Sequence, residues 1–233
     1  MLKVFVRLVA DAALVAFLLF ASAGTIAWQR AWLLVVVLLV VRIVSAVVVY
    51  RVNPALLRER ARLPIHGDQP WSDKVLLLLV ITTGFLGLPV VAGCDVFRWH
   101  VLPPPGTLVS ALGLVLFVLG WVIKGMALRA NAFATSVVRL QHERKHAVAD
   151  TGVYAIVRHP FYAATPLVLA GLSLWLESYT AALVAVIPIA LVVVRLNARA
   201  FSPPRVAGVR CVRATRATPT APRHLVVAST FAR

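Results

Sequence analysis

Residues 151–162, with the sequence TGVYAIVRHPFY, gather side chains that can bind and transform a small molecule. Arg158, His159 and two tyrosines stand beside Pro160, where a polar segment gives way to an apolar one. Proline is favoured in the first turn of a helix, so a helix is predicted to begin at Pro160. Its unpaired amides and positive dipole end, together with the Arg158 guanidinium, suit a carboxylate or a phosphate. The alternative is that Arg158 and His159 only anchor a helix end at lipid headgroups, and these residues alone leave both interpretations open.

The elements that position this segment are predicted to cross a membrane. The chain is 61% hydrophobic and has a mean hydropathy of +0.90, which is typical of an integral membrane protein. A bilayer crossing takes about 20 apolar residues, and each crossing must be an α-helix to pair its backbone amides. The last apolar run is long enough for two spans and is interrupted by Glu177 and Ser178. We therefore expect an all-α protein with five to six spans, the last two forming a hairpin, at residues 8–28, 31–51, 75–94, 106–127 and 161–196.

The net charge of +16 is distributed asymmetrically between these spans. Clusters of Lys and Arg precede the first span, follow the second and follow the fourth, whereas the opposite side offers little beyond Arg30 and Arg98. The positive-inside rule then predicts that both termini and both long loops are cytoplasmic. The basic surface is expected to attract anionic lipid headgroups, and no nucleic-acid partner is inferred.

Two further features concern the spans themselves. Asp11 stands four residues after Arg7, and Arg42 lies in the second span, where an isolated charge would be costly. We interpret these residues as a structural ion-pair group that joins the first two spans. Pro188 is expected to kink the last span, because a proline removes a helical hydrogen bond.

A second motif, His142-Glu143-Arg144-Lys145-His146, matches the H-E-x-x-H pattern of zinc proteases. Such a site normally needs a third protein ligand. The acidic residues downstream are Asp150, which is too close in sequence, and Glu177, which is predicted on the opposite side of the membrane. A membrane zinc metalloprotease is therefore kept as the alternative enzyme, and no metal site is assigned.

The two motifs belong to one longer pattern. Residues 141–162 read QHERKHAVADTGVYAIVRHPFY, which fits Q-x-x-R-x-H-x-[VL]-x-x-x-G-[PV]-Y-x-x-V-R-H-P-x-Y. This pattern closely resembles the isoprenylcysteine carboxyl methyltransferase and phospholipid methyltransferase superfamily, in its bacterial-type members. The resemblance covers most of residues 30–199 and makes the H-E-x-x-H match incidental.

The resemblance implies a membrane enzyme that uses S-adenosyl-L-methionine to methylate a lipid-like acceptor, either an isoprenylcysteine-like carboxylate or a phospholipid amine. Its expected partners are the bilayer and this acceptor, with no obligate protein partner. Arg195 and His159 match the positions expected to be catalytic. The positions expected to bind the cofactor are Gln141, His146, Ala147, Val148, Ala149, Gly152, Tyr154, Arg158, His159, Pro160 and Tyr162.

The chain departs from the family pattern after the last span. Family members continue with a Glu pair and a G-Y-x-x-Y segment, whereas Arg199 stands about where a Glu is expected and no acidic residue follows Glu177. We therefore divide the chain into a transmembrane methyltransferase domain, 1–199, with its cofactor-loop motif at 139–162, and a basic tail, 200–233. The composition of the tail is typical of disorder and suggests the hypothesis of a shifted reading frame. A non-catalytic membrane protein that lacks the acceptor half of the site is the second alternative.

Overall fold

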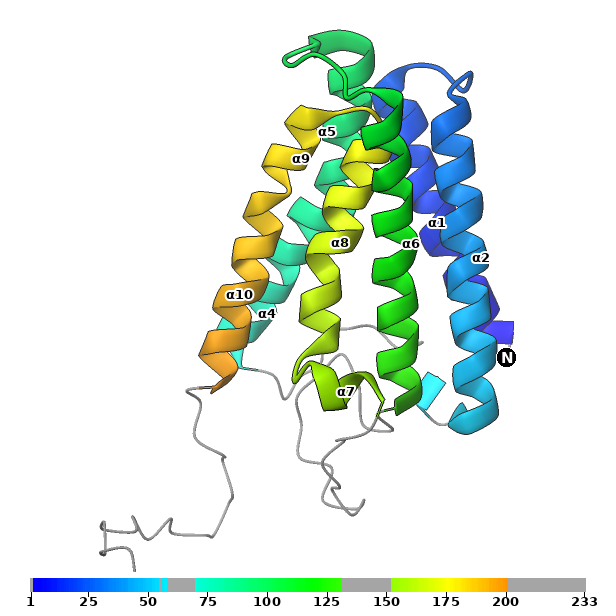
Figure 1. The fold of residues 1–233 in the computed structure, drawn as a ribbon, viewed down its shortest axis with the longest axis vertical. Coiled ribbons are helices and arrows are strands. Elements are labelled where there is room, and N and C mark those ends of the chain that lie inside the picture. Colours follow the sequence, from blue (N-terminus) through cyan, green and yellow to red (C-terminus); the bar gives the residue numbers. More distant parts are fainter. Residues whose placement is uncertain (1, 55, 58–69, 131–151, 201–233) are drawn as a thin grey trace, which may run out of the picture. The chain divides into compact units, whose positions relative to one another are not determined.

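The computed structural model describes residues 2–54, 56–57, 70–130 and 152–200 (Figure 1). Every regular element within these ranges is a helix. The elements are α1 (Leu2–Ala23), α2 (Gln29–Val52), α4 (Trp71–Val80), the π-helix η1 (Ile81–Gly87), α5 (Leu88–Cys94), the π-helix η2 (Asp95–Trp99), α6 (Thr107–Ala130), α7 (Val153–Ile156), α8 (Pro160–Trp175), α9 (Tyr179–Val184) and α10 (Val186–Ala200).

Five of the described helices are long and apolar enough to cross a membrane: Leu2–Ala23, Gln29–Val52, Trp71–Trp99, Thr107–Ala130 and Tyr179–Ala198. A sixth apolar helix, Pro160–Trp175, is shorter. The predicted all-α membrane fold with five to six spans is confirmed, and α8 with α9 and α10 forms the expected terminal hairpin. The alternating charges after the second span predict a short surface helix at 54–62, but residues 58–69 lie outside the described part of the chain.

The observed helices differ from the predicted spans in their bounds, and the first and last spans show the physical reasons. The first helix begins at Leu2 and not near residue 8, because the long stems of Lys3 and Arg7 are compatible with helix and can reach toward polar surroundings. In the last span, the interruption falls at Ala185, between α9 and α10, about one turn before Pro188. Pro188 has no N–H to donate to the carbonyl of Val184, and this missing bond explains the break.

The turn of the terminal hairpin is held by a buried polar contact. Ser178 is the N-cap of α9, and its Oγ accepts a hydrogen bond from the Ala181 N–H at 2.9 Å. The same hydroxyl donates to Asp95 Oδ2 at 2.7 Å, and Asp95 Oδ1 accepts from the Val101 N–H at 3.1 Å. Asp95 is only 3% exposed, so one carboxylate joins the loop after η2 to the hairpin turn.

The predicted ion-pair group of the first two helices is present. Arg42 Nη2 lies 2.7 Å from Asp11 Oδ2, and Arg7 Nε lies 3.0 Å from Asp11 Oδ1. Asp11 thus bridges one turn of α1 and the middle of α2. Arg42 also stacks 5.5 Å from the ring centroid of Trp121 on α6, which compensates an intramembrane charge with an aromatic face.

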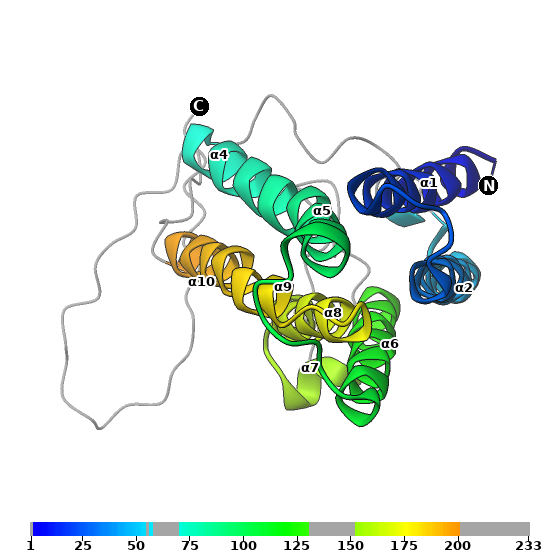
Figure 2. The ribbon, with the colours of Figure 1, turned by 90° about the horizontal axis from the view of Figure 1, so that it is seen from above.

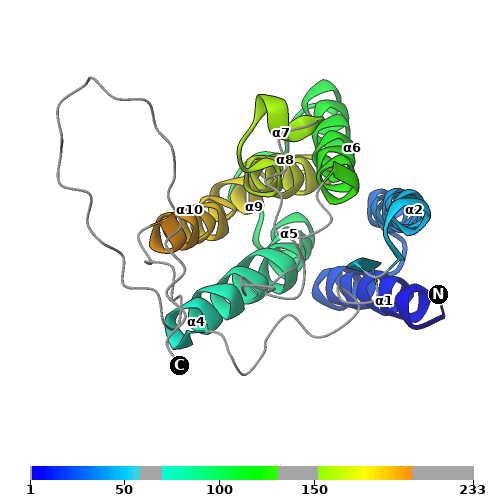
Figure 3. The same ribbon diagram turned by 90° about the horizontal axis from the view of Figure 1, so that it is seen from below.

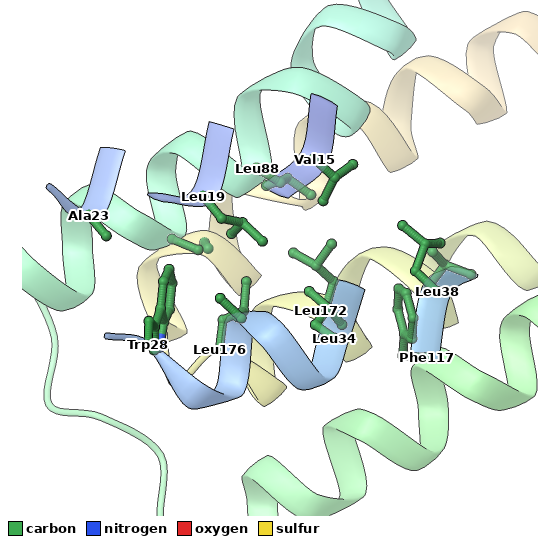
Figure 4. Close-up of a cluster of buried hydrophobic side chains, with 14 of the residues drawn as sticks. Val15, Leu19, Ala23, Trp28, Leu34, Leu38, Leu88, Phe117, Leu172 and Leu176 are labelled. Carbon is green, nitrogen blue, oxygen red and sulfur yellow. The ribbon is translucent and has the colours of Figure 1, made fainter. Parts of the chain in front are cut away.

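Apolar side chains from α1, α2, α5, α6 and α8 form the main core. Figure 4 shows Leu19 and Leu34 pointing toward Leu172 and Leu176, with Phe117 at one side. Leu19, Leu34 and Leu176 are fully buried, and Phe117 is 1% exposed. The core therefore joins the first two helices to α6 and α8.

The most extensive helix pairing in the described part of the chain is between α6 and α8, which lie side by side in both end-on views (Figures 2 and 3). Glycines allow the backbones to touch. A Cβ added at Gly171 would lie 2.5 Å from the backbone N of Phe117 and 2.6 Å from the carbonyl oxygen of Gly113. One added at Gly120 would lie 3.0 Å from the carbonyl oxygen of Ala164. Within lipid, burying apolar side chains gives little attraction between helices, because lipid tails are equally apolar. Small residues let the two backbones pack closely, and this close packing holds α6 and α8 together.

Replacing Gly171 with Ala is expected to destabilise the protein by about 1–3 kcal/mol, because the new methyl must push two backbones apart. Thermal unfolding in detergent measures the change. Gly106→Ala is the matched control, since a Cβ there meets nothing within 4 Å. An unfolding temperature for Gly171→Ala equal to that of Gly106→Ala would contradict the proposed backbone contact.

Candidate functional site

The described part of the predicted cofactor motif lies between the ends of α6 and α8. The described part of the motif begins at Gly152. A Cβ added at Gly152 would lie 3.7 Å from the Cβ of Ala130, the last residue of α6. The end of α6 and Gly152 therefore lie close together. Figure 1 shows α7 bridging this end of α6 and the start of α8.

Gly152 has a backbone conformation that strongly favours glycine, with φ 61° and ψ −129°. It precedes α7, a single turn in which the Ala155 N–H donates to the Gly152 carbonyl at 3.1 Å and the Val157 N–H donates to the Val153 carbonyl at 3.0 Å. Val157 is extended and ends the turn. Gly152 thus sets the direction in which the chain runs toward Arg158 and His159.

The predicted helix start at Pro160 is confirmed, because α8 begins there. His159 precedes it with φ −132° and ψ 66°, and its side chain makes no capping hydrogen bond. Its carbonyl accepts from the Tyr162 N–H at 3.1 Å and the Ala163 N–H at 3.0 Å. The His159 and Tyr162 rings meet edge to face, with centroids 6.1 Å apart. Pro160 itself is buried, so the turn is packed against the bundle while its polar side chains face outward.

Arg158 and His159 are both exposed, and Arg158 has no ion-pair partner among the described residues. Other arginines of the bundle are engaged: Arg30 contacts Glu177 at 2.9 Å, and Arg42 contacts Asp11. A guanidinium beside a helix start, with no carboxylate of its own in the described structure, is suited to an anion from outside.

Arg195, the predicted catalytic arginine, lies on α10 and is only 8% exposed. Its Nε and Nη2 donate to the two carboxylate oxygens of Asp73 at 2.9 and 3.1 Å. Asp73 is in the first turn of α4. Sequence reasoning missed this partner. The sequence offered only a weak signal for it. Asp73 is one of only 8 acidic residues in a chain with 24 basic ones, and it stands at the start of an apolar helix.

The structure brings together only some of the predicted site residues. Gly152, Tyr154, Arg158, His159, Pro160 and Tyr162 lie in the described turn and the start of α8. Arg195 pairs with α4 and not with a described motif residue. The remaining predicted cofactor residues, Gln141 and His146 to Ala149, lie outside the described part of the chain.

The zinc alternative gains no support. The described residues contain no group of three His, Cys, Asp or Glu side chains that could hold a metal ion. The motif residues His142, Glu143 and His146 themselves lie outside the described ranges.

Comparison with known families points to the chemistry. Residues 108–199 match the family model described as phospholipid methyltransferase. The match covers α7, α8 and α9 and all but one residue of α6 and of α10, and with them the described motif and Arg195. The superfamily resemblance predicted from the motif is thereby confirmed.

Curated relatives agree over a shorter segment. Two rice proteins, from Oryza sativa subsp. indica and subsp. japonica, are each named "Probable protein-S-isoprenylcysteine O-methyltransferase". Each is 39% identical to this chain over 56 residues, which is 24% of this chain and 29% of the relative. The chain thus spans less than a third of the length of these relatives. No solved structure matches the chain.

Gly152→Ala tests the geometry of the motif turn. The substitution places a side chain in a conformation that costs roughly 1–3 kcal/mol, so the turn opens more often. Hydrogen–deuterium exchange of the Ala155 and Val157 amides is expected to accelerate about 10-fold or more. The amides of α8 beyond its first turn serve as the internal control, and unchanged exchange in α7 would contradict the assigned conformation.

Proposed function

We propose that this protein is an S-adenosyl-L-methionine-dependent membrane methyltransferase that acts on a lipid-like acceptor. The observation that carries the proposal is the family match over residues 108–199, whose described part includes an exposed arginine at the start of an apolar helix. The proposed organisation keeps residues 1–199 as the methyltransferase domain and residues 200–233 as a separate basic tail. The tail lies outside the described structure apart from Ala200.

The residues at the start of α8 fit the cofactor by charge. S-adenosyl-L-methionine carries a carboxylate, and α8 presents the positive end of a 16-residue helix. Arg158 adds a fork of N–H donors in the same turn. In the proposed role, Arg158 and the helix start hold this carboxylate.

The aromatic residues around Arg158 fit the nucleoside. Tyr154 is partly buried within α7, and Tyr162 lies one turn into α8 with its ring against His159. Flat faces of this kind pack against a purine ring, as aromatic pairs do elsewhere. Gln141 and the run His146–Ala149 are proposed to complete the cofactor site from the segment that joins α6 to Gly152.

The bound cofactor supplies a sulfonium whose methyl group is displaced in line by a carboxylate oxygen or an amine nitrogen. The chain's own task is then to align the acceptor and to exclude water. A carboxylate needs no general base, whereas an amine must first lose a proton. His159 is exposed beside the proposed cofactor site and is the group proposed to accept that proton.

The acceptor is proposed to be lipid-like because the helices expose large apolar side chains along their length, including Phe17, Val36 and Leu112. Such surfaces face lipid in a protein with several membrane-length helices. An acceptor with a hydrocarbon tail can reach the helix ends through the lipid bilayer. The proposed location is a bacterial inner membrane, with both termini and the motif on the cytoplasmic side.

Isothermal titration calorimetry of the purified protein with S-adenosyl-L-methionine tests this function. The wild type is expected to bind, and Arg158→Ala is expected to weaken binding roughly 10- to 100-fold, because a charge-assisted pair is lost. His159→Ala is expected to weaken it in the same direction. Arg51→Ala is the matched control, since Arg51 is an exposed cation at the end of α2, outside the matched residues.

Two results would count against the proposal. If titration of the folded wild type with S-adenosyl-L-methionine releases or absorbs no heat of binding, the result would favour the alternative that this is a non-catalytic membrane protein. An affinity in Arg158→Ala equal to that of Arg51→Ala would remove Arg158 and the α8 start from the cofactor site.

A further inference from the structure

The ion pair between Asp73 and Arg195 has a defined geometry within the bundle. Arg195 Nε donates to Asp73 Oδ1 at 2.9 Å and Nη2 donates to Oδ2 at 3.1 Å. The Asp73 side chain is 14% exposed, and the Arg195 side chain is 9% exposed. The pair joins α4 to α10, which pack against each other.

Stability alone gives a weak reason for such a pair. Burying two charges costs free energy that their attraction often only repays, and apolar residues of similar size would join the two helices at least as well. A bidentate pair does, however, fix the plane and direction of a guanidinium, which a flexible side chain would otherwise sample freely. The pair is therefore better explained by the orientation it gives to Arg195.

Within the described part of the chain, the pairing with Asp73 leaves one edge of the Arg195 guanidinium unused. A guanidinium offers two edges that match a carboxylate or a phosphate: one formed by Nε and Nη2, the other by Nη1 and Nη2. Asp73 occupies the first edge, and Nη1 takes no part in this pair. The direction of the Nη1 edge is thereby fixed by a residue of α4.

We propose that Asp73 is a positioning residue, which aims the Nη1 edge of Arg195 at an oxyanion of the methyl acceptor. This inference rests on the proposed methyltransferase function. It adds to the site a residue that lies outside the matched segment 108–199, so that the first half of the chain completes the acceptor side. The oxyanion is the carboxylate that becomes methylated or the phosphate beside a methylated amine.

The position that Asp73 gives to Arg195 also serves the chemistry. An acceptor oxyanion held by the oriented guanidinium can be aligned with the methyl group that it receives. In a carboxylate acceptor, the new O–C bond forms as the C–S bond of the sulfonium breaks, and the products are an ester and a neutral thioether.

The test compares Asp73→Asn with the wild type in lipid vesicles that contain labelled S-adenosyl-L-methionine. One arm offers N-acetyl-S-farnesylcysteine, and the other offers phosphatidylethanolamine. For the acceptor that the wild type methylates, Asp73→Asn is expected to raise KM about 10-fold and to lower kcat, since a neutral amide holds the guanidinium less firmly. The affinity for S-adenosyl-L-methionine is expected to stay unchanged, which separates lost orientation from lost folding.

Asp11→Asn is the matched control, because Asp11 also pairs with arginines of two helices, α1 and α2, neither of which carries Asp73 or Arg195. It is expected to lower stability and to leave both kinetic constants as in the wild type. Asp73→Glu keeps the charge but moves the carboxylate by one methylene. It is expected to retain the fold with a raised acceptor KM, and it decides the question if Asp73→Asn does not fold.

The outcomes separate the two proposals. Transfer by the wild type to neither acceptor contradicts the proposed function itself. Transfer by the wild type, with acceptor KM and kcat unchanged in the folded Asp73 variants, leaves that function intact and overturns the positioning role. A rise in acceptor KM equal to that of Asp11→Asn also overturns it, because the effect would then follow from losing any interhelical ion pair.

Discussion

The backbone contact between α6 and α8 is the constraint on which the rest of the site depends. Gly171 faces the backbone N of Phe117 without a side chain between them, so the two helices run together along their length. This contact brings the end of α6 and the start of α8 close together, and the short turn from Gly152 to His159 lies between them (Figure 1). The residues that could bind an anion are therefore positioned by a pair of helices that needs no charged group of its own.

Charged residues form a second level of organisation. In an apolar environment an arginine is usually paired, and Arg42 and Arg195 follow this rule through Asp11 and Asp73. Arg158 differs, because it is exposed at a helix start and has no ion-pair partner among the described residues. The contrast separates arginines that hold helices together from one that is available to a ligand, and Arg195 combines both properties if its second edge serves the acceptor.

Local features of the sequence predicted much of this structure. Long apolar runs located the helices, and the i,i+4 spacing of Arg7 and Asp11 with Arg42 in the next helix predicted their ion-pair group. Pro160 marked the start of α8. The contacts of Asp73 with Arg195 and of Asp95 with Ser178 could not be predicted, because they join helices far apart in sequence. The conformation of Gly152 likewise depends on where α6 and α8 place its neighbours.

The most direct measurement is photochemical cross-linking of labelled S-adenosyl-L-methionine to the protein in lipid vesicles, followed by peptide mapping. The account predicts that label enters the peptides that contain Tyr154 to Tyr162, and that an excess of unlabelled cofactor removes it. Label that persists with excess cofactor, or that is confined to α1 and α2, would contradict the assignment of the cofactor site to the turn between α6 and α8.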